Sequence, residues 1–179
     1  ASLLSPGDTA ICIDGGKFGQ RWVELCKNYA LNVVTIEVER GATVDAAIVA
    51  EKLTEHPECK AVCAQLCETS TGATFDIQSI GKVVANTNAV FVVDAISGLG
   101  AEELHTDEWN VDIAIGGSQK GTMLPPGLAF LSISAKAWQL SEQAKSPAYY
   151  FDLRRYRNGH ASGEHPFTPA IGLYIQLEE

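Results

Sequence analysis

The sequence has few basic residues, and none of its apolar runs is long enough to span a bilayer. Lysine and arginine total 13 against 22 aspartates and glutamates, which gives a formal net charge of −9. Binding to nucleic acid or to an anionic membrane requires a basic face. The first residues contain neither a basic region nor a long apolar core, so we expect no secretory signal. We therefore predict no nucleic-acid partner and no membrane partner.

Recognisable metal-ligand patterns are also missing. Cys59, Cys63 and Cys67 recur at intervals of four, which is neither zinc-ribbon nor usual iron–sulfur spacing, and the four histidines show no ligand spacing. We therefore predict no metal site and expect these cysteines to fill the strand at 61–66 as small apolar residues. The odd total of five cysteines favours reduced thiols and a cytoplasmic protein.

Apolar runs alternate with amphipathic stretches along the chain. Strands are expected at 9–13, 33–38, 61–66, 90–93, 113–115 and 128–133, and helices at 18–30, 44–56, 76–87 and 135–144. The alternation predicts an α/β fold with three layers, in which helices cover both faces of a mostly parallel sheet.

The composition changes near residue 146. A chain of 179 residues with 46% hydrophobic content fits a single domain. We expect residues 1–145 to form its core. Residues 146–179 are aromatic, basic and interrupted by proline, so we expect an irregular segment that leads to a helix beginning near Pro169.

Three loops rich in polar and small residues follow predicted strands, at 68–72, 94–100 and 116–122. In parallel sheets ligands bind beyond the carboxyl ends of the strands, so these loops should converge on one edge. Glycine-rich residues 15–19 match neither a dinucleotide fingerprint nor a P-loop, and no Gly-x-Ser-x-Gly elbow is present.

Lys120 and Asp94 are the candidate chemical groups of these loops. Lys120 follows an apolar strand among small residues, and Asp94 ends another apolar run. A surface lysine and a turn-capping aspartate are the simpler interpretations. In a desolvated pocket, however, a lysine becomes a neutral amine that forms a Schiff base with an aldehyde. A buried carboxylate can pair with a pyridinium nitrogen, so the two residues together predict pyridoxal 5'-phosphate (PLP) as the cofactor.

Hydroxyl and amide side chains near this pair are further candidates. The loop at 69–72 is either a hydroxyl-rich turn or a donor to a cofactor oxygen. Ser118 and Gln119 could donate to a phosphate near the same place.

Several segments together resemble the class V PLP-dependent aminotransferases, in the branch of the alanine–glyoxylate and serine–pyruvate aminotransferases. The resemblance lies in residues 68–72 (ETSTG), 93–97 (VDAIS), 112–120 (DIAIGGSQK) and 125–130 (PPGLAF), with weaker matches at 18–22 and 168–171. It covers nearly the whole chain in order. It implies the core of the large domain of a fold type I PLP-dependent transferase.

The resemblance also implies residue roles. Lys120 would be the Schiff-base lysine and would move the proton between the substrate Cα and the cofactor. Asp94 would pair with the pyridine nitrogen, Thr69 would hydrogen-bond near the ring, and Ile96 would pack on one ring face.

Three further residues have implied roles at the edges of the cofactor. Gln119, with Ser118 nearby, would contact its phenolic or phosphate oxygens. Thr168 would reach the phosphate of a neighbouring subunit's cofactor, because sites in this family lie at a homodimer interface. Cysteine desulfurases of this fold usually carry histidine where Gln119 stands, which favours transamination.

The chain also departs from the family pattern. Family members begin earlier, with a phosphate-binding loop and a stacking aromatic residue, and they continue into a smaller C-terminal domain that supplies a substrate-binding arginine. We therefore expect a chain truncated at both ends, without the small domain. Arg154, Arg155 and Arg157 come too early to be that arginine and are expected in a solvated basic loop.

The expected function is amino-group transfer between a small amino acid, alanine or serine, and a 2-oxo acid, glyoxylate or pyruvate. Two alternatives stay open. One is a non-catalytic fragment or interaction module that exposes former interfaces. The other is a different class V activity, such as a lyase or a cysteine desulfurase.

Overall fold

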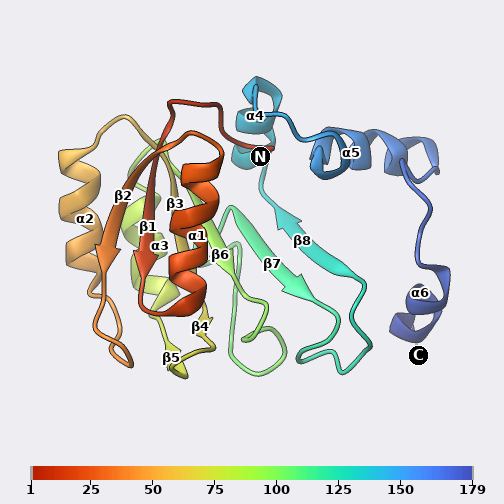
Figure 1. Cartoon of the computed structure of the whole chain (residues 1–179), viewed down its shortest axis with the longest axis horizontal. Coiled ribbons are helices and arrows are strands. Elements are labelled where there is room, and N and C mark those ends of the chain that lie inside the picture. Colours follow the sequence, from red (N-terminus) through yellow and green to blue (C-terminus); the bar gives the residue numbers. More distant parts are fainter. Residues whose placement is uncertain (1, 179) are drawn as a thin grey trace.

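A six-stranded sheet forms the centre of the molecule (Figure 1). The computed structural model describes residues 2–178. The strands lie in the order β2 (Asn32–Glu37), β1 (Thr9–Asp14), β3 (Cys59–Gln65), β6 (Val90–Asp94), β7 (Ile113–Gly117) and β8 (Ala129–Ile133). Neighbouring strands are parallel except β8, which runs antiparallel to β7. The predicted mostly parallel sheet is confirmed.

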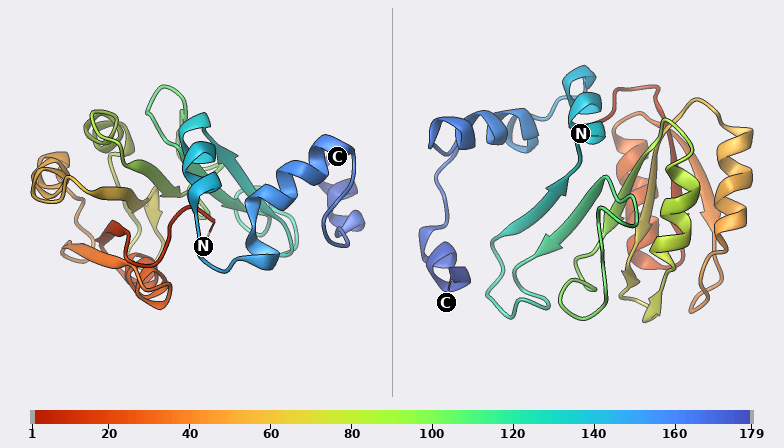
Figure 2. Two further views of the ribbon diagram at one scale, coloured as in Figure 1. Left: turned by 90° about the horizontal axis from the view of Figure 1, so that it is seen from above. Right: turned by 180° about the vertical axis from the view of Figure 1, so that it is seen from behind.

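Helices cover both faces of this sheet, as the sequence predicts (Figure 2). Helix α1 (Lys17–Asn28) packs on β1, β2 and β3 from one side, and α2 (Ala46–Glu55) and α3 (Ile77–Val84) pack on the other. A hydrophobic cluster fills each interface. Helix α4 (Ala135–Gln143) follows β8 and adds Ala137 to the cluster on the α1 face. Because α1 lies over the first three strands, a groove runs beside it over β6 and β7.

Short polar side chains fix where the helices begin. Asp45 caps α2 by accepting a hydrogen bond from the backbone N–H of Ala47 at 2.8 Å. Ser134 caps α4 by accepting from Ala137 N–H at 3.1 Å. Such side chains satisfy backbone donors that the first helical turn leaves unpaired.

The segment after residue 146 corrects one expectation. It contains a 3₁₀ turn, η1 (Tyr149–Phe151), then α5 (Leu153–Ser162) and α6 (Ile171–Glu178), so it is not irregular. Asp152 caps α5, and the three arginines expected in a loop lie on this helix. None of the ten residues of α5 is buried, and the apolar periodicity that identifies helices from sequence is therefore missing. Both helices lie beyond β8 (Figures 1 and 2).

Two smaller points complete the architecture. A short antiparallel pair, β4 (Cys67–Glu68) and β5 (Ala73–Thr74), brackets the loop after β3 and was not predicted from the sequence. Within residues 2–178, the helices are all too short or too polar to cross a membrane.

Candidate active site

The loops that follow β3, β6 and β7 meet at the carboxyl edge of the sheet, at the bottom of Figure 1. The hydroxyls of Thr69 and Ser97 are 2.5 Å apart and join the first loop to the second. Gly121 joins the third loop to the second, because a Cβ atom there would lie 2.1 Å from the carbonyl oxygen of Leu99. Only glycine permits this approach.

Asp94 ends β6 beside Gln65 of β3 and Ile115 of β7. Its carboxylate accepts the backbone N–H of Ile96 at 3.0 Å. Burial raises the pKa of Asp94, while the Ile96 N–H and a hydrogen bond from the side chain of Trp22 act in the opposite direction. A carboxylate in such a place gains from a cationic partner that replaces the lost water.

Lys120 lies in the turn after β7, with its side chain exposed. The turn is closed by a hydrogen bond from Met123 N–H to the Lys120 carbonyl oxygen at 2.9 Å. The positive charge of Lys120 acts to lower the pKa of Asp94, but this effect is small and burial outweighs it. The parallel pairing of β6 with β7 places the two residues at the ends of neighbouring strands.

The side chains of Ile96 and Gln119 both lie close to Gly117. A Cβ atom at Gly117 would be 3.2 Å from the Oε1 atom of Gln119 and 3.7 Å from Cγ2 of Ile96. An aliphatic side chain and an amide thus line the space next to this glycine.

Two predicted site residues are not brought into this group. Ser118 is fully buried, donates its hydroxyl hydrogen to the carbonyl oxygen of Pro125 at 2.7 Å, and accepts from Leu128 N–H at 3.1 Å. Its hydroxyl therefore holds the loop closed and is not free to contact a cofactor. Thr168 is exposed on the segment that links α5 to α6, beyond β8.

Glu68 is a structural residue of the site that the sequence motif did not explain. Its buried carboxylate accepts from the backbone N–H groups of Phe18, Gly19 and Ser70, at 2.9 to 3.3 Å. Burial alone would raise the pKa of Glu68, but the Ser70 hydroxyl and these N–H groups outweigh burial and lower it. The carboxylate thus ties the loop before Thr69 to the amino end of α1.

Gln65 is the second residue that sequence reasoning missed. Its side chain is 1% exposed, and neither Nε2 nor Oε1 has a hydrogen-bond partner within residues 2–178. A buried amide without partners is unusual and needs an explanation. Since Gln65 is paired in register with Asp94, its orphaned polar atoms fit a polar ligand held beside that carboxylate.

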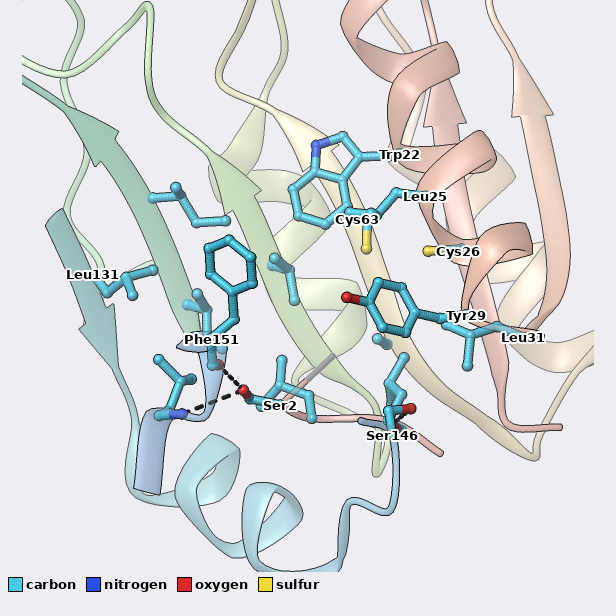
Figure 3. Close-up of a pocket in the computed structure, with 17 residues that line it drawn as sticks. Ser2, Trp22, Leu25, Cys26, Tyr29, Leu31, Cys63, Leu131, Ser146 and Phe151 are labelled. Atoms are coloured by element: carbon cyan, nitrogen blue, oxygen red, sulfur yellow. Dashed lines mark hydrogen bonds between the residues drawn. The ribbon is translucent and has the colours of Figure 1, made fainter. Parts of the chain in front are cut away.

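A groove of about 380 Å³ lies on the α1 face, between α1, the sheet and the segment around Phe151 (Figure 3). Its lining is almost entirely apolar. Trp22 belongs both to this groove and to the surroundings of Asp94, so the groove adjoins the candidate site.

A mostly parallel sheet with a lysine and a half-buried carboxylate at neighbouring strand ends fits the arrangement expected of a PLP-binding transferase. The comparison with protein families agrees, since the family model described as "Aminotransferase class-V" matches residues 1–156. The chain belongs to the class V aminotransferases, a family that uses pyridoxal 5'-phosphate.

Two individual proteins and one crystal structure show which members of the family the chain is similar to. It is 42% identical to the "Soluble hydrogenase 42 kDa subunit" of Anabaena cylindrica, covering 98% of this chain and 47% of the relative. It is 40% identical to the L-aspartate–glyoxylate aminotransferase of Paracoccus denitrificans, over 96% of this chain and 44% of the relative. The crystal structure of an alanine–glyoxylate aminotransferase from Nostoc sp. superposes with a TM-score of 0.93 at 27% identity, over 98% of this chain and 47% of that one. The chain thus spans less than half of the length of these relatives.

Proposed function

We propose that this chain is the cofactor-binding core of an aminotransferase that moves an amino group between alanine or serine and glyoxylate or pyruvate. The observation that carries the proposal is the placement of Lys120 and Asp94 at the carboxyl ends of two neighbouring parallel strands. The names of two similar proteins, from Paracoccus denitrificans and Nostoc sp., contain glyoxylate, which supports that acceptor. The hydrogenase name belongs to the third relative, whereas a lysine and a half-buried carboxylate at neighbouring strand ends support amino-group chemistry.

Four residues of this edge would contact the cofactor in this proposal. The half-buried carboxylate of Asp94 would keep the ring nitrogen of PLP protonated, and Ile96 and Gln119 would contact the ring near Gly117. Thr69, fixed by Ser97, would donate to a ring oxygen. When bound, PLP supplies an electron sink for the charge that develops at the substrate Cα.

Lys120 would hold the cofactor through its Nζ atom and would then serve as the base that removes the Cα proton. A neutral amine is needed for both tasks. The Lys120 side chain is exposed in this chain, so the proposal requires further covering of the site by substrate or by additional protein. Such covering removes water and favours the neutral form.

The assembly and location of the protein belong to the same proposal. We propose a homodimer in which Thr168 of one subunit approaches the cofactor phosphate of the other, with residues 1–145 as the core of each large domain. Exposed apolar side chains near the tail, such as Tyr149 at 71% and Ile171 at 63%, support an interface there. The free thiols of the cysteines agree with a reducing compartment such as the cytoplasm.

The test is cofactor attachment at one lysine. The purified chain is incubated with PLP, reduced with borohydride and digested, and the modified peptide is located by mass spectrometry. We expect modification at Lys120 and its loss in Lys120→Ala. Lys17→Ala is the matched control, because Lys17 is an exposed lysine at the same edge of the sheet. Modification spread evenly over the exposed lysines would contradict the proposal.

Substrate choice needs a second measurement. Amino transfer from alanine, serine and aspartate to glyoxylate is followed by product analysis in the protein that contains this chain. Alanine or serine should be the better donor. Release of elemental sulfur from cysteine, or elimination without amino transfer, would instead assign another class V activity.

A further inference from the structure

Three cysteines that are distant in the sequence meet under α1. Cys12 of β1 and Cys63 of β3 are paired in register on neighbouring strands, and Cys26 of α1 lies over them. All three side chains are buried, and their sulfur atoms lie within 4.8 Å of one another. The evenly spaced Cys59, Cys63 and Cys67 do not form this cluster. Cys59 belongs to the hydrophobic cluster on the opposite face of the sheet.

The spacing of the sulfurs suits a coordinated ion. The Sγ atoms of Cys12 and Cys26 are 3.8 Å apart. A metal–sulfur distance of about 2.3 Å places the sulfurs of a planar three-coordinate site about 4 Å apart. Two adjacent strands and a packed helix hold the three sulfurs in place, so little rearrangement is needed.

We propose that Cys12, Cys26 and Cys63 form a three-sulfur site for a soft monovalent d¹⁰ cation, with Cu(I) as its representative. Soft thiolate ligands select Cu(I) over hard cations. Within residues 2–178 no histidine or carboxylate joins this group. A structural zinc site takes four ligands from the protein, whereas Cu(I) is stable with three sulfurs.

The groove on the α1 face gives the ion a path to the sulfurs. Cys26 and Cys63 line this groove, and Figure 3 shows their sulfur atoms facing one another at its wall. Apolar side chains such as Leu25 and Ile113 form the rest of the surface near them. An apolar lining disfavours a hydrated divalent ion and leaves sulfur as the available donor.

A thiol loses its proton to solvent when its sulfur coordinates a cation, because the thiolate is the form that acts as a ligand. The affinity of the three-sulfur site should therefore rise with pH.

The test titrates the reduced, oxygen-free chain with Cu(I) against a coloured competing chelator. We expect one tightly bound ion per chain, an ultraviolet sulfur-to-copper charge-transfer band, and an affinity that increases with pH. Cys26→Ser should weaken binding by at least about tenfold. Cys67→Ser is the matched control, since Cys67 lies outside the trio, and Lys120→Ala should also bind normally, which separates this site from the cofactor site.

Cooperative unfolding of each variant shows that it is folded, and Cys63→Ser replaces Cys26→Ser if that variant is not. No stoichiometric uptake by the folded wild-type chain would overturn the proposal. So would binding that survives in both Cys26→Ser and Cys63→Ser, or binding that disappears in Cys67→Ser.

Discussion

Glu68 is a charged group that the fold buries and satisfies completely. Three backbone N–H donors and the Ser70 hydroxyl surround its carboxylate. Charged hydrogen bonds of this kind are stronger than neutral ones, and buried donors left unpaired destabilise a protein. The ionised carboxylate of Glu68 therefore anchors the loop that carries Thr69 to the amino end of α1.

Glu68→Gln should lower the free energy of unfolding by about 2 kcal/mol near neutral pH, because the amide presents donors to backbone donors. The pKa of Glu68 is lowered by folding. Its stabilisation is therefore present above the pKa of an unfolded glutamate and is lost as the pH falls through the folded pKa. Urea unfolding across a pH series should show the two proteins converging in acid. The exposed Glu51→Gln is the control, and an equal effect there would contradict the anchoring role.

In the cofactor-free chain, Asp94 should affect the pH dependence of stability in the direction opposite to Glu68. Burial raises its pKa, so the folded chain keeps this proton to a higher pH than the unfolded chain does, and stability falls as the pH rises through that window. The substitution Asp94→Asn removes this loss of stability. The variant should melt a few degrees higher than wild type near neutral pH, with the gain disappearing in acid, while its PLP attachment falls.

Thermal melts at several pH values check this expectation, with the exposed Asp107→Asn as the control. A variant that is less stable than wild type at neutral pH would show that the carboxylate is already well paired without the cofactor.

At the scale of elements, the close approach of two loops positions Lys120. A methyl group at Gly121 would collide with the backbone of Leu99, which has no flexible end to move. Gly121→Ala should therefore displace the turn and slow PLP attachment at Lys120 by about tenfold to 100-fold. The melting temperature should change little, because the sheet is not involved.

Gly172→Ala is the matched control, since no atom lies within 4 Å of a Cβ at that helical position. The attachment rate is followed by absorbance. Unchanged attachment in Gly121→Ala would mean that the two loops separate easily and that their contact does not position the lysine.

The elements that can be predicted from the sequence are those with buried apolar residues. Strand β6 and helix α3 were found because buried apolar residues reveal their periods, and the convergence of the loops followed from parallel strand order. Helix α5 cannot be predicted in this way, because none of its residues is buried and no apolar stripe marks its period. Gln65 and the cysteine trio were missed for another reason. Their significance lies in register between strands that are far apart in sequence.

At the scale of the whole molecule, local stability should fall from the sheet towards the tail. Residues 90–93 of β6 are buried, whereas α6 has eight residues and none of them is buried. A short helix without packing is marginal in water. Hydrogen exchange measured by mass spectrometry should therefore be slowest in β6 and nearly unprotected in α6 at low protein concentration.

Protection in α6 should increase with concentration if this surface joins two subunits. The double variant Ile171→Ser, Ile175→Ser removes two exposed apolar side chains and should abolish that increase. Slow exchange in α6 at every concentration would instead show that the helix is held within one chain.

Helix α1 adjoins three sites, namely the Glu68 carboxylate, Asp94 and the cysteine cluster. Its first turn donates to Glu68, Trp22 in its middle contacts Asp94, and Cys26 follows one turn later. From Phe18 to Cys26 the helix axis advances only about 12 Å. A rigid rod over that distance transmits displacement, so an ion at the sulfurs and a cofactor at Asp94 would act as mutual effectors. Thermodynamic reciprocity then requires each ligand to change the affinity of the other by the same factor.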